Sequence, residues 1–106
     1  MDFSDLGKMQ EMMAQARQMQ EQMEQKLAET IVEAESGGGM VRVRMNGKKE
    51  VLRIKIEPQV VDPNDVEMLE DLIVAGVNEA LRKAQEMMAE EMSKLTGGLK
   101  IPGLSL

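Results

Sequence analysis

The sequence lacks several residue types on which enzyme chemistry depends. Its 106 residues include no Cys, His, Trp or Tyr, and the only aromatic residue is Phe3. The absence of Cys rules out disulfide and thiolate chemistry and fits a reducing compartment. The absence of His removes the usual proton shuttle and the commonest metal ligand. We therefore expect a protein that is not an enzyme, has no small-molecule substrate and requires no cofactor or metal.

Long apolar runs are also missing. No segment approaches the roughly 20 apolar residues that span a bilayer, and the N-terminus has no apolar signal core. The length suits about one domain, near the lower end of the size that supports a single core. These features predict a soluble cytoplasmic protein without a membrane partner.

Methionine and charge are the abundant features. There are twelve Met residues, and in a chain with so few aromatic rings they favour helix-on-helix or helix-on-sheet packing over deep pockets. The formal net charge is −6, yet residues 37–56 (GGGMVRVRMNGKKEVLRIKI) hold six Lys or Arg residues and one acid. Three interpretations of this basic strip are open: a nucleic-acid surface, a partner for internal acids, or an ordinary solvated sheet face.

The first part of the chain, from about Ser4 to Lys26, has the pattern of an amphipathic helix. Apolar residues recur there at spacings of three and four, with glutamines on the opposite face. The stripe consists of Leu6, Met9, Met13, Ala16, Met23 and Leu27, widened by Met12 and Met19. This spacing favours core or coiled-coil packing over a soft Cu(I) site.

The middle of the chain predicts three strands in a meander. Apolar and charged residues alternate in residues 29–36 (ETIVEAES), 40–45 (MVRVRM) and 51–56 (VLRIKI). The glycine triplet 37–39 predicts a loop between the first two strands. Asn46-Gly47 predicts a two-residue hairpin turn with positive φ at both residues, which pairs Met45 with Lys48.

This hairpin register assigns side chains to the two faces of the sheet. Leu52, Ile54 and Ile56 are expected on the face of Val41 and Val43. The opposite face is expected to hold Val51 together with the four cations Arg42, Arg44, Arg53 and Lys55.

The last part of the chain predicts a long helix. Asp62-Pro63 opens it, and the apolar pattern continues to about Leu95, where Gly97-Gly98 stops it. The order is α-β-β-β-α: one α+β domain over residues 1–96 and a flexible tail over residues 97–106.

The lengths of these elements predict contacts beyond the sheet. Helices of roughly 22 and 30 residues measure about 33 and 45 Å, whereas the strands measure about 23 Å. Because the helices overhang the sheet, we expect them to pack on each other or on a second subunit. The open edges of a three-stranded sheet also favour a homodimer.

Basic residues are the candidate binding residues, and they fall into two groups. In the sheet, Glu33 and Glu35 are expected to pair with Arg42 and Arg44. On composition alone, such ordinary ion pairing on a solvated sheet face is favoured over a nucleic-acid surface. In the helices, an antiparallel arrangement would bring Lys8 near Lys94, and Arg17 toward Arg82 and Lys83. Acids at positions 86, 90 and 91 oppose a positive surface there.

The order of motifs resembles the YbaB/EbfC family of bacterial nucleoid-associated proteins. The resemblance rests on KMQEMMAQARQMQEQM, ESGGGMVRVRMNG, VLRIKIEP and above all DVEMLEDLIVAGVNEALRKAQE, and it covers nearly the whole chain. It implies a homodimer with a central sheet and projecting helix pairs, which binds double-stranded DNA with little sequence preference. It also implies association with the nucleoid and roles in nucleoid organisation and gene expression.

The resemblance ranks the candidate DNA contacts. The helix cations Lys8, Arg17, Arg82, Lys83 and Lys94 come first, and the sheet cations Arg42, Arg44, Arg53 and Lys55 come second. The alternative function is a prefoldin-like chaperone or adaptor, which would bind apolar clients through Met-rich helices. Salt separates the two functions, because phosphate contacts weaken steeply with salt and apolar contacts do not.

Overall fold

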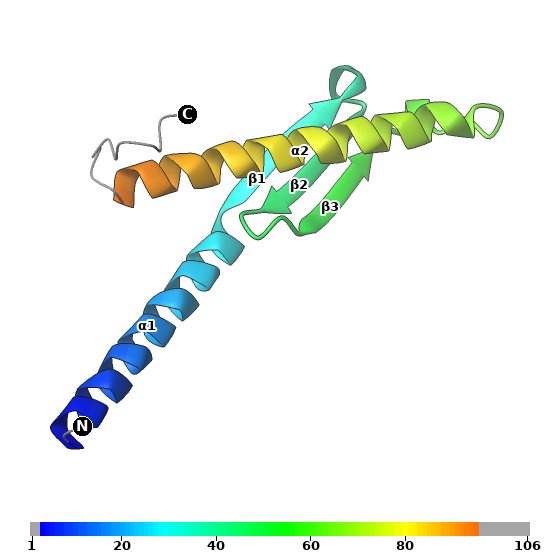
Figure 1. Cartoon of the computed structure of the whole chain (residues 1–106). Helices are drawn as coiled ribbons and strands as arrows, with labels where there is room; N and C mark the ends of the chain where they lie inside the picture. The colour runs from blue at the N-terminus through cyan, green and yellow to red at the C-terminus, as the bar shows by residue number, and fades with distance from the viewer. Residues whose placement is uncertain (1–2, 96–106) are drawn as a thin grey trace.

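The computed structural model describes residues 3–95 and confirms the α-β-β-β-α order (Figure 1). Its elements are α1 (Phe3–Glu29), β1 (Ile31–Ser36), β2 (Val41–Asn46), β3 (Val51–Ile56) and α2 (Val66–Leu95), with short 3-10 turns at Gly37–Gly39 and Pro58–Val60. Helix α1 continues three residues beyond the predicted end. The predicted stop at Gly97-Gly98 and the predicted flexible tail lie outside the described residues.

The three strands form one antiparallel sheet in the order β1-β2-β3. Val43 is the Cα partner of Ala34 on one side and of Ile54 on the other, and Val41 is the partner of Ile56. Because partners in an antiparallel pair share a face, the apolar residues of β2 and β3 lie together as predicted.

The predicted two-residue turn at Asn46-Gly47 is wrong. Asn46 N–H donates to Glu50 O (3.1 Å), and the Asn46 Oδ1 accepts hydrogen bonds from the backbone N–H groups of Lys48 and Glu50. The positive φ falls on Lys49 (φ 66), not on Asn46 or Gly47. A short polar side chain that satisfies two backbone donors stabilises this longer turn.

The longer turn also changes the register at the start of β3. Arg44 pairs with Arg53 but Met45 pairs with Val51, so Leu52 is an extra residue in β3. Val51 therefore lies opposite the buried Met45, and its predicted place among the cations is wrong.

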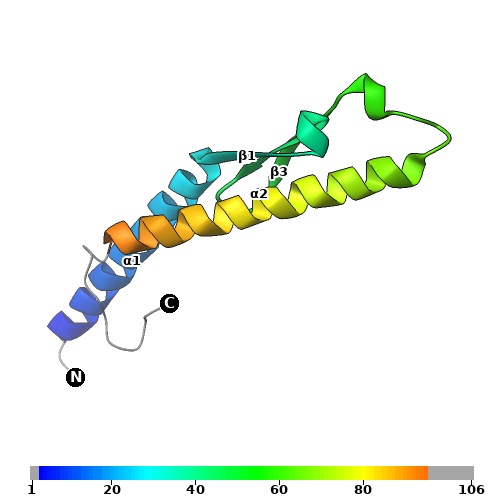
Figure 2. The ribbon, with the colours of Figure 1, turned by 90° about the horizontal axis from the view of Figure 1, so that it is seen from above.

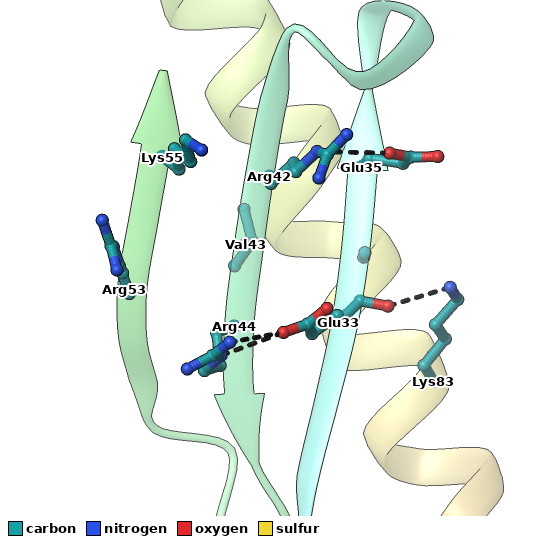
Figure 3. A pocket seen from close by; sticks show the side chains of 9 residues that line it. Glu33, Glu35, Arg42, Val43, Arg44, Arg53, Lys55 and Lys83 are labelled. Carbon is teal, nitrogen blue, oxygen red and sulfur yellow. Dashed lines mark hydrogen bonds and ion pairs between the residues drawn. The ribbon is translucent and has the colours of Figure 1, made fainter. Parts of the chain in front are cut away.

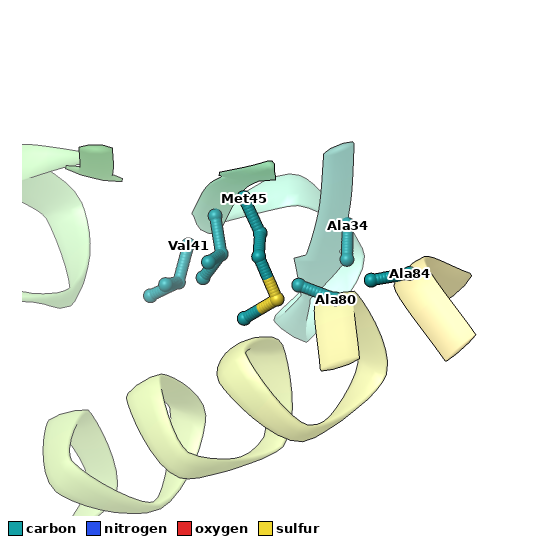
Figure 4. Packing of buried hydrophobic residues seen from close by; sticks show 6 residues of the cluster. Ala34, Val41, Met45, Ala80 and Ala84 are labelled. Atoms are coloured by element: carbon teal, nitrogen blue, oxygen red, sulfur yellow. The ribbon is translucent and has the colours of Figure 1, made fainter. Parts of the chain in front are cut away.

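Helix α2 covers one face of β1 and β2 (Figure 4). The core is small, and its fully or almost fully buried apolar residues are Ala34, Val41, Val43, Met45, Ala80 and Ala84. Small residues on α2 allow a close approach to the sheet. A Cβ on Gly76 would lie 3.0 Å from the Val43 Cγ2.

Helix α1 projects away from this core (Figures 1 and 2). The Cα radius of gyration is 20.7 Å, against about 13 Å for a compact chain of about 100 residues. One residue, Thr30, separates α1 from β1, and the turn after β2 holds the end of the helix. Gly47 N–H donates to Leu27 O (2.8 Å) and to Thr30 O (2.9 Å).

The two helices do not pack along each other within one chain. Their contact is limited to the ends, where Lys26 Nζ lies 3.0 Å from a carboxylate oxygen of Glu91. From this point α1 runs outward from the sheet toward the N-terminus, whereas α2 runs back across the sheet (Figure 1). The methionine stripe of α1 is therefore exposed in the single chain, with Met9, Met13 and Met23 50%, 61% and 43% accessible.

Candidate functional site

The face of the sheet opposite α2 carries a square of four cations. Arg42 and Arg44 lie on β2, and their Cα partners on β3 are Lys55 and Arg53, respectively. Like charges directly opposite each other on neighbouring strands destabilise a sheet. Two such pairs side by side form a surface that a bound anion would stabilise.

Strand β1 supplies two carboxylates to the same face (Figure 3). Arg44 donates from Nε and Nη2 to the Glu33 Oε1, at 3.0 and 2.7 Å. Arg42 Nε lies 3.7 Å from the Glu35 Oε2. The predicted pairing of these arginines with Glu33 and Glu35 is confirmed.

The other two cations of the square have no such partner. Neither Arg53 nor Lys55 makes an ion pair with any residue of the described range 3–95. Figure 3 shows both side chains on β3 without an acid beside them. They are therefore the cations of this face that are free to meet an anion from solution.

Lys83 extends this surface from α2. Its Nζ donates to the backbone carbonyl of Glu33 (2.9 Å), which lies on the free edge of β1 (Figure 3). The five basic side chains and two acids line a hollow of about 500 Å³ with a net charge of +3. Sequence reasoning grouped Lys83 with the helix cations, because nothing in the sequence links it to Glu33, 50 positions away.

The cations of α2 are held by acids on the same helix. Arg82 makes ion pairs with Glu79 and Glu86, three and four residues away. The hydrogen bond from Arg82 lowers the pKa of Glu79, and the pairing with Glu79 raises the pKa of Arg82. A further anion at Arg82 would therefore compete with the carboxylates of Glu79 and Glu86.

Lys94 lies near the end of α1 and not near its start. Lys94 and Lys26 both approach Glu91, at 3.8 and 3.0 Å, and their contacts lower the pKa of Glu91, chiefly through the hydrogen bond from Lys26. Lys8 precedes Lys26 by 18 residues, which is about 27 Å along a helix. Within one chain the predicted approach of Lys8 to Lys94 is therefore wrong.

Arg17 and Arg82 are also separated. Arg17 lies nine residues before Lys26 on α1, and Arg82 lies nine residues before Glu91 on α2. From the contact between Lys26 and Glu91, α1 runs away from the sheet whereas α2 runs back across it, so the two arginines lie in different directions (Figure 1). Lys8 and Arg17 are exposed on α1, without an ion pair among residues 3–95. The structure thus brings the sheet cations together and leaves the predicted helix cations apart.

The net charge also differs between the helices and the sheet. Helix α1 carries three basic and five acidic residues, and α2 carries three and seven. Residues 37–56 carry six basic residues and one acid. Fold and site together define a small α+β protein with a basic sheet face on an otherwise acidic chain.

Comparison with known proteins identifies the family. The model of the YbaB/EbfC DNA-binding family matches residues 6–99, and the chain belongs to this family. A nucleoid-associated protein of Alkaliphilus metalliredigens is 57% identical over 99 residues, covering 91% of this chain and 87% of the relative. One from Syntrophobacter fumaroxidans is 56% identical over 97 residues, covering 89% and 88%.

A solved structure supports the fold. The crystal structure of an uncharacterized protein from Helicobacter pylori has a TM-score of 0.67 and 28% sequence identity, covering 91% of this chain and 98% of that chain. Neither helix within residues 3–95 combines the length and the apolar content needed to cross a membrane.

Proposed function

We propose that this protein is a nucleoid-associated protein of the cytoplasm that binds double-stranded DNA with little sequence preference, as a homodimer and without catalysis. Binding would alter DNA conformation and so influence nucleoid organisation and gene expression. The observation that carries the proposal is the basic square Arg42, Arg44, Arg53 and Lys55 on the outer face of the sheet. Membership of a DNA-binding family supports the choice of DNA as the polyanion.

The chemistry of this face favours phosphates over bases. Arg and Lys on a flat surface bind backbone phosphates, which carry no sequence information. Sheets that bind single strands stack the bases on aromatic side chains, but the only aromatic residue in the sequence is Phe3, in α1. This composition supports the proposal of a duplex ligand and low sequence preference.

The exposed apolar surface supports the homodimer. Helix α2 covers mainly β1 and β2, and Leu52 and Ile54 of β3 remain 49% and 38% exposed on an open edge strand. The methionine stripe of α1 is exposed as well. A second copy that pairs with the edge of β3 would cover both of these exposed apolar surfaces.

Anisotropy of a labelled mixed-sequence duplex, titrated with protein at several salt concentrations, tests DNA binding. Log affinity should fall linearly with log salt, with a slope of about 0.9 for each phosphate neutralised. Reversing Arg53 and Lys55 to Glu should weaken binding strongly. Reversing Lys8 and Arg17 to Glu changes the net charge equally on α1 and should have the smaller effect. Absence of binding even at low salt would refute the proposal.

The exposed methionines of α1 favour one other function, the binding of apolar protein clients. Met12 and Met19 are 68% and 70% accessible on a projecting helix, and Met-rich surfaces adapt to many partners. A chaperone or adaptor of this kind would suppress client aggregation independently of salt and would not retain DNA. That combination of results would replace the DNA-binding proposal.

A further inference from the structure

The carboxylates of Glu33 and Glu35 lie against the arginine side chains that would bind phosphate on the basic face. Arginine binds phosphate through two parallel N–H donors, and Arg44 directs two donors, Nε and Nη2, at the Glu33 Oε1. Glu35 lies beside Arg42, with its Oε2 3.7 Å from the Arg42 Nε. Half of the basic square is therefore neutralised by strand β1 before any ligand arrives.

We propose that Glu33 and Glu35 are internal competitors of DNA phosphates for Arg44 and Arg42, and that they set the affinity of the sheet face for DNA. The inference rests on the proposed DNA binding and adds a regulatory role for β1. When DNA approaches the sheet face, Arg53 and Lys55 make the first contacts with its phosphates. The two arginines join only when a phosphate displaces the carboxylate.

The geometry makes this exchange possible. All four side chains of the two ion pairs are at least half exposed, at 51% to 65%, and exposed ion pairs contribute little to stability. A phosphate can therefore replace the carboxylate without unfolding the sheet. The backbone of Glu33 stays in place because β1 pairs with β2 and because Lys83 binds the Glu33 carbonyl.

The two pairs are not equivalent. Glu33 accepts two hydrogen bonds from Arg44, whereas the 3.7 Å between Glu35 and Arg42 is an ion pair without a hydrogen bond. Arg42 is therefore released more easily than Arg44. Removing the charge of Glu33 should increase affinity more than removing the charge of Glu35.

The test is the double variant Glu33→Gln/Glu35→Gln, measured by anisotropy with the same labelled duplex. We expect Kd to fall several-fold and the salt slope to become steeper by up to about 1.8, since two further arginines neutralise phosphates at about 0.9 each. Adding Arg42→Gln and Arg44→Gln to the double variant should abolish both gains.

The matched control is Glu67→Gln/Glu70→Gln on α2, whose two exposed acids make no ion pair within residues 3–95. It changes the net charge by the same amount and releases no basic side chain. We expect a smaller change in Kd and an unchanged slope. Equal gains in both double variants would show a general charge effect and overturn the inference.

Two further outcomes separate the inference from the proposed function. If the wild-type protein binds the duplex and Glu33→Gln/Glu35→Gln binds with the same Kd and slope, the inference is wrong and DNA binding stands. If the wild-type protein and the double variant both fail to bind at low salt, the proposed function fails and the inference fails with it. Far-UV circular dichroism of each variant confirms that the fold is retained.

Discussion

Replacing Gly47 by Ala tests how the hairpin holds helix α1. Gly47 is required by a close approach and not by its φ, since it is absent from the glycines with positive φ. A Cβ at this position would lie 2.9 Å from the Leu27 carbonyl oxygen and 3.0 Å from the Leu27 Cδ2. The nearest atom belongs to the backbone, so no side-chain rotation relieves the contact. Either the end of α1 or the turn must move.

The expected cost follows from two terms. Inserting a methyl group into a packed contact costs about 1–3 kcal/mol. Movement of α1 also lengthens the hydrogen bond from Gly47 N–H to Leu27 O, now 2.8 Å, and weakening such a bond costs about 0.5–1.5 kcal/mol. The sum is about 1.5–4.5 kcal/mol, which lowers Tm by at least roughly 6 °C in a domain of this size.

Urea and thermal unfolding followed by far-UV circular dichroism measure this effect, because a chain without Trp or Tyr offers little intrinsic fluorescence. Protein concentration is kept constant, since the proposed dimerisation would make Tm depend on it. The matched control is Gly7→Ala in α1, where nothing lies within 4 Å of the new Cβ. The same substitution should there stabilise the helix by about 0.5–1 kcal/mol. Equal Tm values for Gly47→Ala and the wild type would refute the proposed anchoring of α1.

Three further predictions concern the core, the open edge and the pH dependence. Met45 is 2% exposed in the core, so Met45→Ala should cost about 2–5 kcal/mol, measured by urea unfolding. Ile54→Lys should leave the helical content unchanged and shift the sedimentation coefficient to that of a monomer; an unchanged coefficient would exclude the edge of β3 from the dimer interface. The pKa values of Glu79 and Glu91 are lowered from 4.5 in the folded protein, so their contribution to stability is present above that value and lost as pH falls through the folded pKa. The urea midpoint should therefore fall on acidification below about pH 4.5, and by less in Glu79→Gln; an identical pH profile in that variant would contradict this role of the Arg82 ion pair.

Periodicity was sufficient to predict the order of the elements and the faces of the sheet, except at Val51 beside the bulge. The alternation in residues 40–45 and 51–56 placed Val43 and Ile54 on one face because the two-residue period of a strand survives any even change in register. The turn itself was not predictable from Asn46-Gly47. Its length depends on the hydrogen bonds from Lys48 and Glu50 to the Asn46 side chain and on the contact of Gly47 with Leu27, twenty positions earlier. Both involve residues outside the dipeptide.

The candidate site was predictable in its sheet portion and not in its helical portion. Residues on one strand face are placed by local alternation, so Arg42, Arg44 and their partners Glu33 and Glu35 followed from the sequence. The relative direction of two helices depends on the junction at Thr30 and on contacts such as the one between Lys26 and Glu91. Sequence periodicity contains no information on the angle between the two helices, so within one chain the expected approach of Lys8 to Lys94 was wrong.

Because only Thr30 separates helix α1 from the sheet, the helix moves relative to the sheet as one rigid rod. The helix has 27 residues and a length of about 40 Å, and its last turn is tied to the sheet by backbone hydrogen bonds. A rotation of the helix by about 10° about Thr30 moves its N-terminal end by about 7 Å. This displacement is close to twice the spacing of successive phosphates along the axis of one DNA strand. Small adjustments of the backbone at one residue therefore set the distance between the free end of the helix and the basic sheet face.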